Sequence, residues 1–173
     1  MTTAPETYYM LPAEFAQALG QAVASFGWLE EIIKRTIYAL DRARLAEDLT
    51  HEELQTWLTH MENIADDSMG TLIEQLDAAM RRHPGLRERN RITDRLNEIK
   101  QQRNLLCHAS WRPTEEKGRW HPAFVNTRGE VFDHSFAVED LEAAREATIE
   151  IGRRVLRVMR ATGVQGEWPG DDE

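Results

Sequence analysis

Cysteine is nearly absent from this chain, since Cys107 is the one cysteine among 173 residues. A single cysteine excludes an internal disulfide and any zinc site built from several cysteines, so we expect a reducing, cytoplasmic setting. Long hydrophobic runs are absent as well. No stretch of about 18 apolar residues exists, and we therefore expect no membrane-spanning helix. The N-terminal segment lacks the basic and apolar regions of a secretory signal, so we expect no such signal.

Positive charge is scarce overall but concentrated in one segment. The chain has 21 Lys and Arg against 30 Asp and Glu, for a net charge of −9. Nine of the basic residues and only three of the acidic ones lie between Arg81 and Arg112. A local positive strip on an acidic protein can attract a polyanion, because binding responds to the local potential. We expect RNA contacts at four positions of this strip: Arg87, Arg91, Arg95 and Arg112. A solvated helix face balanced by acidic neighbours is an equally good interpretation.

Most of the chain has apolar residues at three- and four-residue spacing, which is typical of amphipathic helices. This spacing predicts a long first helix, a short second one, a third capped by Ser68, a basic fourth one and a last one that begins at Val138 and stops at Gly163. The first four are expected over Pro12–Arg44, over a short stretch after Thr50, over Ser68–Met80 and over Arg87–Trp111. Within the last of these ranges, the residue pattern ceases to be helical after His108.

Residues 111–136 differ from the rest, because aromatic and β-branched residues alternate there with turn glycines. Such a pattern predicts a small β-hairpin or meander. The expected fold class is therefore all-α, an antiparallel four- to five-helix bundle with a small β-hairpin inserted before the last helix. We expect a flexible N-terminus over 1–11, a single helical domain over 12–162 and an acidic tail over 163–173.

The C-terminal end of the basic helix carries three candidate catalytic residues, Arg103, Asn104 and His108. Asn104 and His108 are four residues apart and share one helix face, which Arg103 flanks. Arg103 also takes a position that the apolar periodicity reserves for a buried residue, which is costly unless the charge meets a partner. Histidine transfers protons near neutral pH, and arginine binds phosphate oxygens. The set suits RNA cleavage in which the ribose 2′-OH is the nucleophile, and this chemistry requires no metal or other cofactor.

The segment R-N-L-L-C-H, from Arg103 to His108, resembles the R-x4–6-H motif of the HEPN family. The Ala-Ser-Trp that follows, ending at Trp111, and the acidic Glu30 in the first helix are also similar to features of that family. The resemblance implies a helical, metal-independent endoribonuclease that acts as a homodimer with one composite cleft. It also implies that His108 transfers protons, that Arg103 stabilises the phosphate and that Asn104 is a polar orienting residue. Glu30 and Trp111 would have supporting roles. Such domains serve in RNA processing or as toxins and defence components.

Other interpretations of the same residues stay open. Arg103 paired with Glu30, and His108 capping the helix end, would give a catalytically inert module that binds RNA or protein. An interaction protein that binds an antitoxin or a nucleotidyltransferase is a further possibility. A metal site is less favoured, because adjacent helical residues point about 100° apart and rarely share an ion; the side chains considered for it are Cys107, His108, His121 and His134. Trp111 and Trp120 are candidates for stacking on bases.

Overall fold

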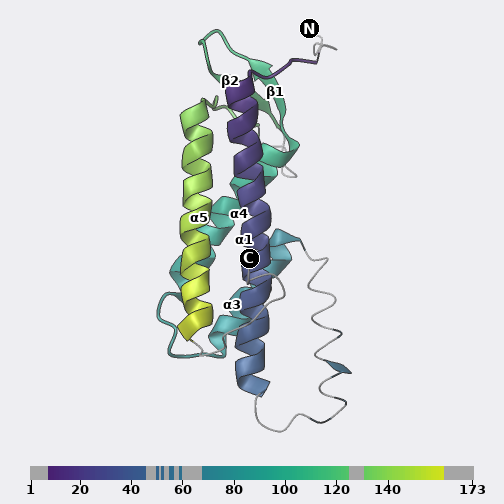
Figure 1. Cartoon of the computed structure of the whole chain (residues 1–173), viewed down its shortest axis with the longest axis vertical. Helices are drawn as coiled ribbons and strands as arrows, with labels where there is room; N and C mark the ends of the chain where they lie inside the picture. Colours follow the sequence, from purple (N-terminus) through teal and green to yellow (C-terminus); the bar gives the residue numbers. More distant parts are fainter. Residues whose placement is uncertain are drawn as a thin grey trace, which may run out of the picture.

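The computed structural model describes residues 8–45, 68–124 and 131–161, together with positions 50, 52, 55, 56 and 59. Four of the described elements are helices and two are short strands (Figure 1). They are α1 (Ala13–Leu45), α3 (Met69–Arg81), α4 (Arg89–His108), β1 (Ser110–Pro113), β2 (Trp120–Ala123) and α5 (Val138–Ala161). The apolar positions of the predicted short helix after Thr50, the predicted stop at Gly163 and the acidic tail lie outside the described residues.

The structure confirms a mostly helical chain with a small antiparallel hairpin before the last helix. Ser68 is the N-cap of α3, as the sequence predicts, and its hydroxyl accepts a hydrogen bond from the backbone N–H of Thr71 at 3.4 Å. The long first helix also spans nearly the predicted range. None of the described helices is long and apolar enough to cross a membrane.

Among the described elements, α1 and α5 have the most extensive contact, and they run side by side in the same direction (Figure 1). Arg145 donates a hydrogen bond to Gln21, and the backbone of Gly152 faces the ring of Trp28. Both pairs have the same separation in sequence, as two parallel helices require. In contrast, α3 and α4 are antiparallel, because Asp77 meets Arg89 while Gly70 lies against Lys100 near the other end. The α3–α4 pair is thus antiparallel as predicted, whereas α1 and α5 are parallel, so the predicted antiparallel arrangement does not extend to every pair of neighbouring helices.

The core lies between these helices and is almost wholly aliphatic and aromatic. Each helix contributes one apolar stripe, as its residue spacing predicts. Two polar residues of the core, Thr36 and Thr148, donate their hydroxyl hydrogens to the carbonyls of Ile32 and Ala144 one turn earlier. These bonds satisfy hydroxyl groups that would otherwise be buried without a partner. The largest fully buried side chains include Phe15, Phe26, Leu29, Ile33, Leu40, Leu72, Leu76, Ile92, Leu96 and Ile99.

The basic helix ends earlier than the sequence suggests. Helix α4 stops at His108, and Ala109 is extended (φ −68°, ψ 141°), so Trp111 lies on strand β1 rather than on the helix.

The strands are also shorter than the predicted 111–136 region. Pro113 pairs with Trp120, and Phe136 adds a single bridge to Trp120. Gly118 adopts φ +83° in the connecting turn, a conformation that favours glycine.

An aromatic cluster fixes the hairpin to the N-terminal end of α1. The ring of Phe15 contacts Trp111 edge-on, with centroids 5.2 Å apart, and lies 6.0 Å from the ring of Trp120. Trp111 also meets Phe136 at 5.8 Å. The hairpin begins two residues after His108, so this cluster also fixes the path of the chain that leaves the candidate site.

Candidate functional site

Arg103 on α4 is held between two helices. Its Nε lies 3.5 Å from Oε1 of Glu30 on α1, and its Nη1 donates a hydrogen bond of 3.3 Å to Oδ1 of Asn104. The arginine side chain is 32% exposed and the glutamate 23%, so the pair lies at the surface end of the α1–α4 contact. This pairing explains how a charge occupies a position on an apolar stripe. The carboxylate meets the guanidinium, and the cost of partial burial falls.

The guanidinium of Arg103 keeps part of its hydrogen-bonding capacity. Glu30 takes Nε and Asn104 takes Nη1, while Nη2 has no hydrogen-bond or ion-pair partner among the described residues. An arginine offers five N–H donors in a planar fork. Oriented by two neighbours, it retains donors that can bind a further anion.

His108 is the last residue of α4 and is exposed. It makes no hydrogen bond or ion pair within the described part of the chain, and the C-cap is formed by Ala109, whose N–H donates to the carbonyl of Leu105. The predicted alternative, that the His108 side chain caps the helix, therefore finds no bond to support it. The imidazole is accessible to a ligand or to another chain.

Cys107 lies close to the Arg103–Glu30 pair. Burial raises the pKa of the Cys107 thiol, the positive charge of Arg103 opposes this rise, and the negative charge of Glu30 adds to it. Because the net effect is a raised pKa, the thiol stays protonated at neutral pH and is a poor nucleophile. The chemistry of this region therefore depends on the Arg, Asn and His side chains.

Trp111 does not lie in this polar group. Its ring is half-buried in the aromatic cluster with Phe15 and Phe136. Its supporting role is structural, because it anchors the strand that follows His108.

Several arginines of the basic segment from Arg81 to Arg112 are paired with acidic neighbours. Arg89 and Arg81 both reach Asp77, at 2.8 Å each, and Arg82 reaches Asp41 at 2.5 Å. Burial tends to raise the pKa of Asp77, but hydrogen bonds from Thr93 and Arg89 and the charges of the two arginines outweigh it and lower that pKa. The hydrogen bonds that Arg89 and Thr93 donate to Asp77 join α4 to α3 and stabilise the packing of these two helices.

A shallow groove between α4 and α5 continues this charge balance. Arg91 and Arg95, two of the predicted RNA-binding residues, line it beside Asp94 and Glu98. Arg95 is paired with Glu98, and on the α5 side Arg154 is paired with Glu150 at 2.7 Å. Arg87 is exposed just before α4 begins. The groove thus carries equal numbers of acidic and basic side chains, which favours the interpretation of a solvated, balanced face.

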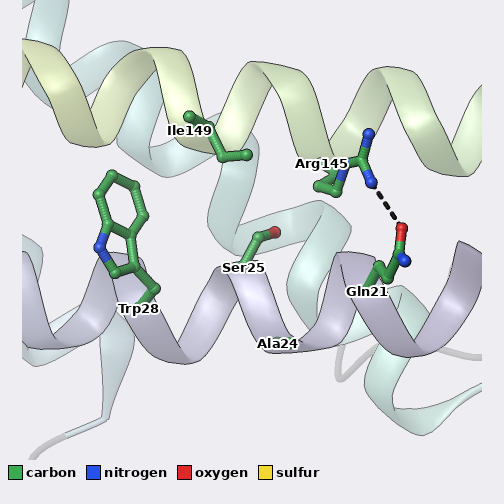
Figure 2. Close-up of a pocket in the computed structure, with 6 residues that line it drawn as sticks. All are labelled: Gln21, Ala24, Ser25, Trp28, Arg145 and Ile149. Atoms are coloured by element: carbon green, nitrogen blue, oxygen red, sulfur yellow. Dashed lines mark hydrogen bonds between the residues drawn. The ribbon is translucent and has the colours of Figure 1, made fainter.

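An apolar pocket lies away from these groups, between α1 and α5 (Figure 2). Its volume is about 390 Å³, and it opens to solvent. Figure 2 shows the hydrogen bond from Arg145 to Gln21 at one end and the ring of Trp28 at the other. The pocket has no titratable group suited to proton transfer, and its lining residues are Gln21, Ala24, Ser25, Trp28, Arg145 and Ile149.

Within the described ranges, no three His, Cys, Asp or Glu side chains gather in a way that would hold a metal ion. Of the histidines considered for a metal site, His121 is on β2, and His134 contacts the ring of Phe132.

Comparison with known proteins adds no family assignment: no family model matches the chain, and no curated protein or solved structure is significantly similar to it.

The structure brings together Glu30, Arg103 and Asn104, with His108 one turn further along α4. One residue that the sequence did not single out for RNA binding is His121, which lies directly opposite Arg112 across the hairpin. The register of the two strands is what places His121 beside Arg112, and knowing it would have identified this residue. Register depends on the length of the connecting turn, and the alternation of residues alone does not reveal it.

Proposed function

We propose that the protein is a metal-independent endoribonuclease of the HEPN type. The observation that carries the proposal is the state of Arg103, which is oriented by Glu30 and Asn104, retains an unengaged Nη2, and lies one helical turn before an exposed His108. The helical architecture with an acidic residue on α1 facing the motif helix agrees with the family that the sequence resembles. A toxin or defence role is part of this proposal.

The chemistry is an internal transfer at phosphorus. The 2′-oxygen of a ribose attacks the adjacent phosphorus, the bond from phosphorus to the 5′-oxygen breaks, and a 2′,3′-cyclic phosphate and a 5′-hydroxyl result. One proton leaves the 2′-OH and one arrives at the 5′-oxygen. His108 serves proton transfer, a role that typically contributes 10²- to 10⁴-fold in rate. Arg103 stabilises the added negative charge on the phosphate oxygens, and Asn104 orients the guanidinium.

Two proton transfers at opposite sides of the phosphorus fit two imidazoles better than one. Each chain supplies a single His108 at the exposed end of α4. A homodimer that places two α4 ends around one phosphate would provide both a base and an acid. We therefore propose a two-fold symmetric dimer with a composite cleft, in which each chain is a HEPN-like helical domain.

One observation favours a second candidate function. The ion pair between Arg103 and Glu30 compensates the charge of the arginine within the chain, as expected for a catalytically inert HEPN dimer that binds RNA or a protein partner, such as an antitoxin or nucleotidyltransferase. The two functions differ in what His108 does. In the inert module, its exposed imidazole has no chemical task.

The test compares cleavage by the wild type and two histidine variants in the presence of EDTA. Structured and unstructured RNA are incubated with the wild type, with His108→Ala and with His134→Ala, which removes another exposed histidine. We expect cleavage by the wild type and by His134→Ala, and a loss of at least 10²-fold in His108→Ala. Equal cleavage by all three proteins would refute the role of His108, and RNA binding without cleavage would favour the inert module.

A further inference from the structure

The β1–β2 hairpin has two chemically different faces. Trp111 on β1 points toward Phe15 and Phe136. Side chains alternate along a strand, so Arg112 points to the opposite, outer face. The register places His121 of β2 directly opposite Arg112, and the outer face therefore presents these two side chains as a cross-strand pair.

Within the part of the chain that the structure describes, neither side chain of this pair has a partner that accounts for it. Arg112 and His121 are both half-buried, and neither makes a hydrogen bond or ion pair with the described residues. Arg119, on the same hairpin, has by contrast Ser135, Asp140 and Glu116 as partners. Directly opposite residues have Cβ atoms about 4.5–5.5 Å apart, close enough for both to bind one anion. Because no described carboxylate pairs with Arg112, its guanidinium has donors available for an external anion.

The pair also lies near the candidate site. Arg112 follows His108 by four residues, and an extended chain of that length spans at most about 13 Å. Arg91, on the strip predicted from the sequence, is 17 residues before His108 on the same helix, which corresponds to about 25 Å along the axis. The α4 groove that contains Arg91 is charge-balanced. The position beside His108 and the charge balance of the α4 groove both favour the hairpin over the α4 strip as the surface that meets RNA next to His108.

We propose that Arg112 and His121 bind a phosphate of the RNA backbone flanking the bond at His108, so that the outer face of the hairpin is a substrate-binding surface. The inference rests on the proposed nuclease function for the identity of the ligand. Arginine offers a bidentate fork to phosphate oxygens, and an imidazole N–H adds one donor from the opposite strand.

The test uses the full chain and a single-stranded 2′-O-methyl RNA, which keeps the phosphates and lacks the nucleophilic hydroxyl. Binding is measured by fluorescence anisotropy over a range of salt concentrations for the wild type, Arg112→Gln, His121→Gln and Lys117→Gln. Lys117 is exposed in the turn of the same hairpin, so its variant is a matched control for the lost charge in Arg112→Gln. Thermal unfolding of each variant verifies that the fold is retained.

We expect Arg112→Gln to weaken binding about tenfold at low salt and His121→Gln to weaken it by a smaller factor. The slope of log K against log salt should fall in magnitude by about 0.7 for the lost phosphate contact in Arg112→Gln. Lys117→Gln should bind like the wild type. Equal binding by Arg112→Gln and the wild type, an equal loss in Lys117→Gln, or no binding by the wild type would overturn the proposal. Because the probe cannot be cleaved, these results are independent of cleavage. Arg112-dependent binding without cleavage of ordinary RNA would refute the nuclease and leave the binding surface intact.

Discussion

The contact of Trp28 with Gly152 gives a sharp prediction about how α1 and α5 are held together. A Cβ atom added at Gly152 would lie 2.2 Å from Cζ3 and 2.5 Å from Cη2 of the Trp28 ring. Carbon atoms in good contact are about 3.5–4.0 Å apart, so the ring or the helices would have to move by more than about 1 Å. The tryptophan is two residues before Glu30 on the same helix, so the two side chains lie on different faces, with Trp28 against α5 and Glu30 against α4.

The expected magnitude for Gly152→Ala is the difference of two terms. Overpacking of a well-packed contact costs about 1–3 kcal/mol. Replacing a helical glycine by alanine returns about 1 kcal/mol. We therefore expect the free energy of unfolding to fall by about 0–2 kcal/mol in Gly152→Ala. Gly27, on α1, has no atom within 4 Å of an added Cβ, so Gly27→Ala should instead raise the free energy of unfolding by up to about 1 kcal/mol.

Urea unfolding of both variants measures these changes, provided that the m-value stays constant. The informative quantity is the difference between the two identical substitutions, expected to be about 1–3 kcal/mol. In a Trp28→Leu background, which removes the ring, Gly152→Ala should become neutral or stabilising. Equal stabilisation by Gly152→Ala and Gly27→Ala in the wild-type background would refute the close packing of Trp28 on α5.

Three further predictions concern the charged groups. The pKa of Asp77 is lowered below 3.8, so its contribution to stability is present above that pH and is lost as the pH falls through the lower, folded pKa. Asp77→Asn should lower the free energy of unfolding at pH 7 by about 1–3 kcal/mol and weaken the acid-induced loss of stability below pH 4, as urea titrations would record; an unchanged pH profile would contradict this. Glu30→Gln should lower the pKa of the Cys107 thiol and speed its alkylation at pH 8, while Arg103→Gln should slow it and Glu31→Gln should leave it unchanged. Arg103→Lys keeps the charge but loses the fork, and we expect RNA cleavage to fall about 10²-fold with little change in thermal stability; full activity would show that the guanidinium is not needed.

Much of the local structure followed from the sequence because it depends on neighbouring residues. The apolar stripes of α1 and α5 and the cap at Ser68 are properties of short segments, and the structure confirms them. The end of α4 was placed too late, at Trp111. The spacing of apolar residues does not show whether an apolar residue such as Trp111 belongs to the last turn of a helix or to the start of the next strand.

The relative direction of the helices could not be read from the stripes. An apolar stripe packs equally well against a parallel or an antiparallel partner, and the offset that sets Trp28 on Gly152 depends on the length of the connections. The neutralisation of the basic strip was also a long-range effect. Asp41 on α1 is 41 residues from its partner Arg82, and Asp77 on α3 lies just before the counted segment, so a count limited to that segment overstates the free positive charge.

The candidate site was predicted in part. The position of Arg103 on an apolar stripe indicated that it needs a partner, and the pairing with Glu30 that the sequence offered as one interpretation is confirmed at 3.5 Å. The separation of Trp111 from the polar group and the cross-strand pairing of Arg112 with His121 depend on the hairpin register. That register is set by the turn between the strands, where alternation in the sequence gives no unique answer.

The central claim is that Arg103, Asn104 and His108 catalyse cleavage of RNA through its own 2′-OH, and analysis of the product ends tests it most directly. RNA incubated with the purified protein in EDTA should yield fragments with 2′,3′-cyclic phosphate and 5′-hydroxyl ends, while the 2′-O-methyl form of the same sequence stays intact. Absence of cleavage, or fragments with 5′-phosphate ends, would contradict the claim.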